Sequence, residues 1–384
     1  MGLQVVLTAD NHLDPPAVMF GSKRYERKGD FLRCFGEVVD FALENKPDIF
    51  LVSGDFFDHI QPRNPTRTRI MGYFKSLYDS GIKVFLISGH HDTPKSVEQG
   101  MSPLAVYGRS GYAKYFQNST RLESVSLEID GLKTIISGMS YNPTLSWDED
   151  PLKDVKLPKV GDVNIMLLHY PISGFKGYYA NEPKVQPGSI PADLQLVAAG
   201  HLHSYQREKI GDVEVVYPGS TERVDFSEEG EEKGFVWLEL DKSGVVSEEF
   251  IKTHAREMKT LEYKVEKRGK ISDSLKSALY KIKDPELILR VRLLGEVSVK
   301  RLSTYRRADI LSFAEELFFT LLIDESRLEI EDLGALEPLP QTTPLKQLSL
   351  YFQKRMEKAE SMEKALLREA LRICEKKLQE AGGW

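Results

Sequence analysis

Val84-Phe-Leu-Ile-Ser-Gly-His-His-Asp92 decides how this chain of 384 residues folds, because an apolar run ends there at a glycine and delivers two histidines and an aspartate. The run from Val84 to Ile87 has the composition of a strand from a sheet that is covered on both faces. Ligands bind to open α/β sheets beyond the carboxyl ends of their strands. We therefore expect other strands to deliver chemically active side chains to the same edge.

Four further segments repeat this pattern of an apolar run followed by Asp or His. They are Val5 to His12, Ile49 to Asp58, Ile165 to His169 and Leu196 to His203. Apolar residues at helical spacing predict helices over 31–45, with Asp30 as the N-cap, and over 65–80, so the first three strands form β-α-β units. Further strands are expected at 124–128, 133–136, 213–217 and 235–240. The pattern predicts an α/β fold, a two-sheet sandwich with its strands ending on one active edge.

The composition changes near Lys252, where the chain becomes basic and amphipathic. A helix over 272–282, a strand over 287–293 and a helix over 307–322 predict a second, small α+β unit. Three prolines, at positions 338, 340 and 344, indicate a linker, and the absence of Gly and Pro over 345–381 predicts a helical tail. The expected domains are 1–250, 251–333, a Pro-rich linker at 334–344 and a tail at 345–384.

The formal net charge of −6 argues against a protein that simply coats nucleic acid, but the charge is unevenly distributed. Between Lys252 and Arg307 there are 16 Lys and Arg against 7 Asp and Glu, a local balance of +9. This segment is a candidate phosphate-binding face, although a solvated helix and hairpin would also be charged. Cys34 and Cys374 are far apart and suit reduced thiols. No apolar stretch approaches the roughly 18 residues that span a bilayer, so we expect a cytoplasmic protein with no membrane contact.

Six of the eight histidines lie at the ends of predicted strands. A single histidine in such a place is more often a packing residue than a ligand, but five signals in order predict a metal site. Two divalent ions about 3.5 to 4 Å apart need a shared carboxylate, with imidazole and oxygen ligands around each. Asp55 is the natural bridge. This donor set favours Mn²⁺, with Fe or Zn possible and Mg²⁺ disfavoured because it prefers oxygen ligands.

Five motifs resemble those of the calcineurin-like metallophosphoesterases. They are Asp10-x-His12, Gly54-Asp55-x-x-Asp58, Gly89-x-His91-Asp92, His169 and Gly200-His201-x-His203. Two further features resemble the SbcD-type nucleases of double-strand-break repair, the meiotic-recombination-eleven family. One is Tyr217-Pro-Gly-Ser-Thr-Glu-Arg223 followed by Phe226-Ser-Glu-Glu229, and the other is the basic unit with its helical tail. The resemblance is strong over 3–240 and extends to the remainder in layout only.

The resemblance implies two Mn²⁺ per subunit. Around the first ion it places Asp10, His12, Asp55 and His203, and around the second Asp55, His90, His169 and His201. It implies that His91 is the catalytic imidazole, which protonates or stabilises the leaving 3′ oxygen, and that Asp92 orients His91. Asp58 is expected beside the site without ligating. The family has Asn where this chain has His90, so the second site either keeps its ion with altered geometry or is weakened.

The implied function is a Mn²⁺-dependent DNA nuclease, with 3′ to 5′ exonuclease and single-strand endonuclease activity, that processes DNA ends in double-strand-break repair near the nucleoid. The basic unit would cap the DNA. An apolar stripe over 345–384 resembles the family's docking element for its SMC-like ATPase partner, the SbcC type or Rad-fifty family, although a helix packed on its own domain would look the same. Residues 70–77 and 104–107 are either a homodimer contact or core. The alternatives are a small-molecule phosphodiesterase of the same superfamily and a DNA-tethering scaffold with an impaired metal site.

Overall fold

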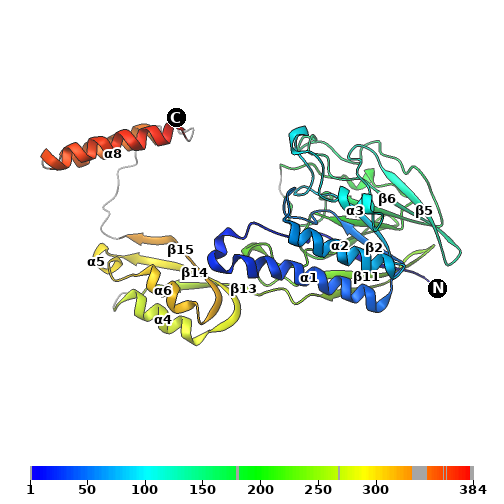
Figure 1. Ribbon diagram of the computed structural model, residues 1–384, viewed down its shortest axis with the longest axis horizontal. Helices are drawn as coiled ribbons and strands as arrows, with labels where there is room; N and C mark the ends of the chain where they lie inside the picture. The colour runs from blue at the N-terminus through cyan, green and yellow to red at the C-terminus, as the bar shows by residue number, and fades with distance from the viewer. Residues whose placement is uncertain are drawn as a thin grey trace. The chain divides into compact units, whose positions relative to one another are not determined.

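The structure is a computed structural model that describes residues 2–178, 181–266, 269–330, 344–357, 359 and 361–380 (Figure 1). The chain divides into two compact units, Met1–Leu294 with Tyr305–Arg327, and Gly295–Thr304 with Leu328–Trp384. The first unit contains two six-stranded sheets and most of a three-stranded sheet. The C-terminal helices belong to the second unit.

The first six-stranded sheet has a parallel centre and an antiparallel edge. Its order is β12 (Gly244–Lys252), β11 (Gly234–Asp241), β1 (Leu3–Thr8), β2 (Ile49–Ser53), β3 (Lys83–Ile87) and β4 (Lys114–Tyr115). The strands from β1 to β4 run parallel to one another, while β11 is antiparallel to β1 and to β12. The carboxyl ends of β1, β2 and β3 therefore meet at one edge, as the sequence predicts.

The second six-stranded sheet is built in the same way. Its order is β5 (Glu123–Ile129), β6 (Leu132–Gly138), β7 (Val163–His169), β8 (Leu196–Gly200), β10 (Val213–Tyr217) and β9 (Gln206–Ile210). The four strands β6, β7, β8 and β10 are parallel, and the two outer strands are antiparallel to their neighbours. Because β7 and β8 contact β2 across the sandwich, their carboxyl ends lie beside those of the first sheet.

Helices α1 (Arg24–Asn45), α2 (Asn64–Asp79) and α3 (Ala105–Ser110) cover the outer face of the first sheet; Figure 1 shows α1 and α2 beside the strands β2 and β11. An aromatic cluster fills this layer, with Phe35, Phe56 and Phe74 in contact. A second apolar cluster lies between the two sheets, and a third covers the far face of the second sheet with loop residues such as Tyr170. The predicted two-sheet α/β sandwich is confirmed.

A smaller three-stranded sheet follows, in the order β13 (Met258–Lys264), β14 (Asp284–Val297) and β15 (Phe318–Ile330). Helices α4 (Ile271–Lys281) and α6 (Arg307–Ala314) accompany this sheet and pack on each other, while the short helix α5 (Val299–Leu302) belongs to the second unit. The side chains of Leu275, Leu279 and Ile310 are buried there. This part of the chain is α+β, although the domain boundaries 250/251 and 333/334 stay predictions.

Arg256 joins the small sheet to the first layer of helices. Its guanidinium bonds to both oxygens of Asp30, at 2.7 and 2.9 Å, and its charged group lies 3.8 Å from the centre of the Phe319 ring. Asp30 also accepts a hydrogen bond from buried Arg27. Burial raises the pKa of Asp30, but the hydrogen bonds and charge of Arg256 outweigh it, so the pKa falls below its usual value.

Three expectations for local structure were wrong or incomplete. Helix α1 begins at Arg24, so Asp30 is an internal helical residue held by arginines and not an N-cap. The predicted helix over 307–322 ends at Ala314, and Phe318 begins strand β15, whose buried and half-buried side chains alternate. Strands β9, β12 and β13 were not predicted, because they combine apolar residues with many exposed charged ones.

The tail is helical where the structure describes it, as predicted, and its described residues form two helices. Helices α7 (Pro344–Glu357) and α8 (Ser361–Glu380) pack on each other, and the Ser349 hydroxyl donates to Glu375 at 2.9 Å. The prolines at 338 and 340 lie outside the described residues. Within the described residues, no helix is both long and apolar enough to cross a membrane.

Candidate metal centre

The predicted ligands lie at the adjoining strand ends of the two sheets. Backbone groups hold the loops together, since the Asp10 N–H donates to the Gly54 carbonyl at 3.1 Å and the His12 N–H to the Asp55 carbonyl at 3.0 Å. The Asp10 carboxylate accepts the His201 N–H at 3.0 Å, and the Asp55 Oδ1 accepts the His91 N–H at 2.7 Å. The carboxylates therefore bind the loops that carry the histidines as well as facing the site.

Backbone strain occurs at several of the same residues. Asp10, His12, Asp55 and His201 have φ values of 48°, 43°, 45° and 97°, in the left-handed region that non-glycine residues rarely adopt. Such conformations cost of order 1–3 kcal/mol each and persist where the surrounding structure enforces them, which is typical of functional sites.

Gly89 leaves space for the site. A Cβ atom at this position would lie 2.3 Å from Asp55 Oδ1 and 2.6 Å from His169 Nε2. Both distances are well inside van der Waals contact, so any side chain here would displace the carboxylate or the imidazole. The glycine that ends the β3 run is therefore required by the close approach of Asp55 and His169.

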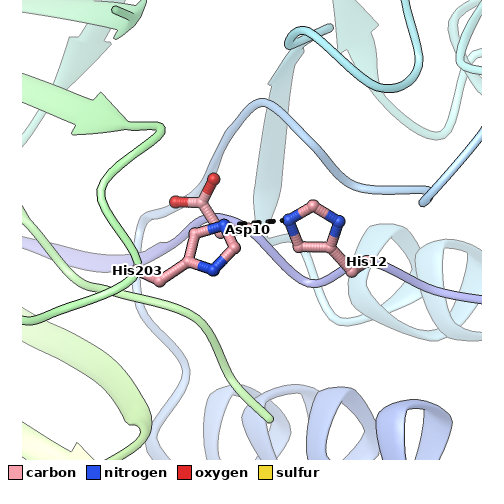
Figure 2. Close-up of side chains that lie close together, drawn as sticks. All are labelled: Asp10, His12 and His203. Carbon is pink, nitrogen blue, oxygen red and sulfur yellow. Dashed lines mark hydrogen bonds between the residues drawn. The ribbon is translucent and has the colours of Figure 1, made fainter. Parts of the chain in front are cut away.

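Among the described residues, three groups of side chains place one ligand atom each within 4.8 Å of the others. They are Asp10 with His12 and His203, His12 with Asp55 and His91, and Asp10 with Asp55 and His169. Figure 2 shows the first group, in which His12 Nε2 and His203 Nε2 face each other at 3.1 Å. Asp55 belongs to two of the groups, as expected of a carboxylate shared by two ions.

His169 provides a test of whether a cation fits. Its Nδ1 donates to the Ser53 carbonyl at 2.7 Å, and its buried Nε2 lies 3.2 Å from Asp55 Oδ2. Among the described residues, none makes a hydrogen bond to this Nε2. Burial lowers the pKa of His169, but the Asp55 carboxylate raises it more, to about 9. A buried imidazole nitrogen and a buried carboxylate oxygen 3.2 Å apart are two ligand atoms between which a divalent cation fits, and a thiol-free set of Asp and His suits Mn²⁺, Fe or Zn.

His90 and His201 belong to none of the three groups found among the described residues. His90 Nε2 lies 3.4 Å from Lys95 Nζ, and its ring packs on Tyr141; burial and then the charge of Lys95 lower the pKa of His90 to about 4. His201 Nε2 hydrogen-bonds to Glu182 Oε2 at 2.9 Å. Both stay predicted ligands of the second ion, and His90 is the one that departs from the family pattern.

His91 lies at the rim of the site, with 42% of its side chain exposed. Its Nδ1 donates to the Asp58 carbonyl at 3.0 Å, and its ring meets that of His12 edge-on. The buried Asp92 carboxylate instead accepts the N–H groups of Phe56, Phe57 and Gly89. Among the described residues, therefore, the Asp58 carbonyl holds the His91 ring, and Asp92 ties the Asp55 loop to the β3 turn. The orienting role of Asp92 toward His91 stays a prediction.

Burial, and then the nearby charge of Asp55, raise the pKa of Asp92 to about 7. Asp55 shows the opposite shift: burial raises its pKa, but His169 and His12 lower it well below the usual range. One buried carboxylate is therefore held ionised beside the imidazoles, and its neighbour is held closer to neutral.

Two carboxylates contact the Nδ1 atoms of His12 and His203, the histidines predicted to bind the first ion. Asp58 Oδ1 lies 3.1 Å from His12 Nδ1, and Glu228 Oε1 lies 2.7 Å from His203 Nδ1. Sequence reasoning placed Asp58 beside the site but assigned no role to Glu228. The stretch Phe226-Ser-Glu-Glu229 was the available signal, and it was interpreted only as part of a family resemblance. Glu182, the partner of His201, had no signal.

The chain matches known proteins at two levels. A family model described as calcineurin-like phosphoesterase matches residues 3–205, more than half of the chain. The chain therefore belongs to the calcineurin-like phosphoesterases, and the predicted class of enzyme, a metal-dependent phosphoesterase, is confirmed.

Curated archaeal relatives extend the similarity. The chain is similar to the DNA double-strand break repair protein Mre11 of Methanopyrus kandleri (25% identical over 275 residues, 68% of this chain and 59% of the relative). It is also similar to the proteins of that name from Methanocaldococcus jannaschii (26% over 287 residues, 69% and 73%) and Sulfolobus acidocaldarius (26% over 317 residues, 78% and 77%). The predicted resemblance to this nuclease family is confirmed, although the match with the Methanopyrus protein spans only 59% of its length.

Proposed function

We propose that this chain is a Mn²⁺-dependent DNA nuclease that processes DNA ends in double-strand-break repair, with 3′ to 5′ exonuclease and single-strand endonuclease activity. One observation carries the proposal: Asp10, His12, Asp55, His169 and His203 converge in groups that suit two cations sharing Asp55. The relatives named for DNA double-strand break repair supply the substrate class.

The residues around Asp55 would hold the two ions, which supply Lewis acidity to the phosphate and to water. Asp10, His12 and His203 would complete the first set, and His169, His201 and His90 the second. His91 Nδ1 donates to the Asp58 carbonyl, which turns Nε2 toward the site; when the ring carries its second proton, the Nε2–H would protonate or stabilise the leaving 3′ oxygen. The Asp92 carboxylate holds the Asp55 loop and the β3 turn together through hydrogen bonds to their backbone N–H groups.

The basic segment would place the DNA backbone across the site as a capping domain. Several of its lysines are exposed, including Lys264, Lys270, Lys281 and Lys283. Its arginines are largely paired, as Arg292 is with Asp324 at 3.0 Å, so the lysines are the groups that would meet phosphate. Contacts of this kind give affinity without sequence preference.

The α7–α8 hairpin would dock the SMC-like ATPase partner. Leu366 and Ile373 are 69% and 51% exposed on α8, so part of the apolar stripe is not used by the hairpin itself. Part of this apolar surface is therefore left for a partner.

The segments 70–77 and 104–107, which were considered as a homodimer contact, contribute residues such as Phe74 and Leu104 to the core. A homodimer would instead use exposed residues of the same helices. We propose a cytoplasmic, nucleoid-associated complex.

The position of His90 favours one rival, a DNA-tethering scaffold whose second metal site is impaired. Cleavage of a labelled DNA duplex with Mn²⁺, measured beside cleavage of an aryl phosphodiester, separates the possibilities. A nuclease cuts the duplex. A small-molecule phosphodiesterase cuts only the aryl ester, and a scaffold retains the duplex in a gel-shift assay while cutting neither.

A further inference from the structure

Glu228 is a buried carboxylate in contact with the imidazole of His203. It ends the 3-10 helix η4 (Phe226–Glu228), and its Oε1 lies 2.7 Å from His203 Nδ1. Its other oxygen, Oε2, pairs with Lys233 Nζ at 2.7 Å and accepts the Val224 N–H at 3.1 Å and the Ser220 hydroxyl at 3.3 Å. Three donors thus fix one oxygen, and the other is left for the histidine.

This contact determines which nitrogen of His203 can bind a cation. An ionised carboxylate accepts hydrogen bonds only, so His203 Nδ1 must carry the proton. The lone pair is then on Nε2, which lies 3.1 Å from His12 Nε2 and in one group with Asp10. Carboxylates that hold the far nitrogen of a ligating histidine fix its tautomer and its direction.

We propose that Glu228 is a positioning residue of the metal centre, which holds His203 in the Nδ1–H tautomer and directs its Nε2 to the ion shared with Asp10 and His12. The inference rests on the proposed metal site. It gives the stretch Phe226-Ser-Glu-Glu229 a physical role that the metal motifs do not include.

Lys233 makes the arrangement rigid. Its side chain is fully buried, and its ammonium also bonds to Glu231 at 2.9 Å and to the His203 carbonyl at 3.0 Å. The same ion pair therefore holds both the ring and the backbone of His203. Side chains locked in this way by surrounding hydrogen bonds are what a precise site requires.

The neighbouring Glu229 supplies a matched control. Its Oε1 accepts the Thr260 N–H of β13 at 2.7 Å, so it docks η4 on the small sheet and, among the described residues, makes no hydrogen bond to the histidines. Glu228→Gln and Glu229→Gln remove the same charge one residue apart. Only Glu228→Gln alters a side chain that contacts His203.

Glu228→Gln should reverse the tautomer. Lys233, Val224 N–H and Ser220 all donate to Oε2, so the amide oxygen of glutamine takes that place and its NH₂ faces His203 Nδ1. His203 must then accept at Nδ1 and carry its proton on Nε2, where it cannot bind a cation. We expect Mn²⁺ to bind roughly 10- to 100-fold more weakly, measured by the electron paramagnetic resonance signal of free Mn²⁺ during titration of the full chain.

The tautomer has a readout of its own, independent of activity. In metal-free protein with ¹⁵N-labelled histidine, the His203 signals should exchange their Nδ1–H pattern for an Nε2–H pattern in Glu228→Gln and stay unchanged in Glu229→Gln. Glu231 still pairs with Lys233 in the variant, so it should fold, and its melting temperature checks this. Glu228→Asp is the second variant: it keeps the charge beside Lys233 but shortens the reach to His203, and it should also weaken Mn²⁺ binding.

The outcomes are distinguishable. Failure of the unchanged chain to bind Mn²⁺ would overturn the proposed metal site. The role of Glu228 alone would be overturned if the unchanged chain binds Mn²⁺ and both Glu228 variants bind it with the same affinity and keep the His203 tautomer. Weaker binding with an unchanged tautomer in Glu228→Gln would also contradict it.

Discussion

Gly89→Ala should disable the site without replacing any predicted ligand. The added Cβ would lie 2.3 Å from Asp55 Oδ1, 2.5 Å from the Asp55 backbone nitrogen and 2.6 Å from His169 Nε2. Atoms in contact need about 3.5 Å, so the carboxylate, the imidazole or the β3 turn must move by roughly 1 Å. A misplacement of about 1 Å can cost 10²-fold in rate, so we expect phosphodiesterase activity to fall by roughly 100-fold.

The assay pairs Mn²⁺ titration with initial rates on a labelled duplex and on an aryl phosphodiester. Gly72→Ala is the matched control, because a Cβ there meets nothing within 4 Å on the exposed face of α2. It should keep full activity and gain about 0.5–1 kcal/mol in the free energy of unfolding. Unchanged metal binding and rate in Gly89→Ala would show that Asp55 and His169 do not need their observed positions, which would refute the reasoning.

Three other changes test separate parts of the chain. His91→Ala should lose roughly 10²- to 10⁴-fold in cleavage rate while elemental analysis shows its metal retained; loss of the metal would make His91 a ligand. Asp30→Asn should lower the free energy of unfolding by about 3 kcal/mol at pH 7, because two arginines lose a buried partner. The pKa of Asp30 is lowered in the folded state, so this stability is present above about pH 3.9 and is lost as the pH falls further; urea unfolding from pH 7 to pH 3 should show the two proteins converging only at the acid end. Deleting residues 345–384 should leave cleavage of short DNA intact and abolish co-elution with the ATPase partner, and a complex that persists would assign docking elsewhere.

The clustering of side chains at the strand ends could be predicted, because parallel strands bring their carboxyl ends to one edge of the sheet regardless of the loop conformations. That rule correctly placed Asp10, Asp55 and His169 together. The start of α1 could not be predicted, since Asp30 looks like an N-cap until Arg256, far away in sequence, is seen to bind it. Local patterns carry no information on such long-range pairs.

The same limit explains the parts of the site that were missed. Glu228 has no motif spacing of its own, and its role depends on the fold bringing η4 to His203. Asp92 is next to His91 in sequence, but its carboxylate turns to the backbone of Phe56 and Phe57. In β15, Phe318 and the apolar residues after it fit a helix as well as a strand, and pairing in the small sheet decides between them.

The most direct test of the central claim, that Asp55 bridges two ions in one catalytic centre, is elemental analysis of the purified chain and of Asp55→Ala, combined with cleavage of a labelled duplex. The unchanged chain should bind about two Mn²⁺ and cut the duplex only when Mn²⁺ is present. Asp55→Ala should bind neither ion and cut nothing. Undiminished metal in Asp55→Ala, or cleavage by it at the normal rate, would contradict the account.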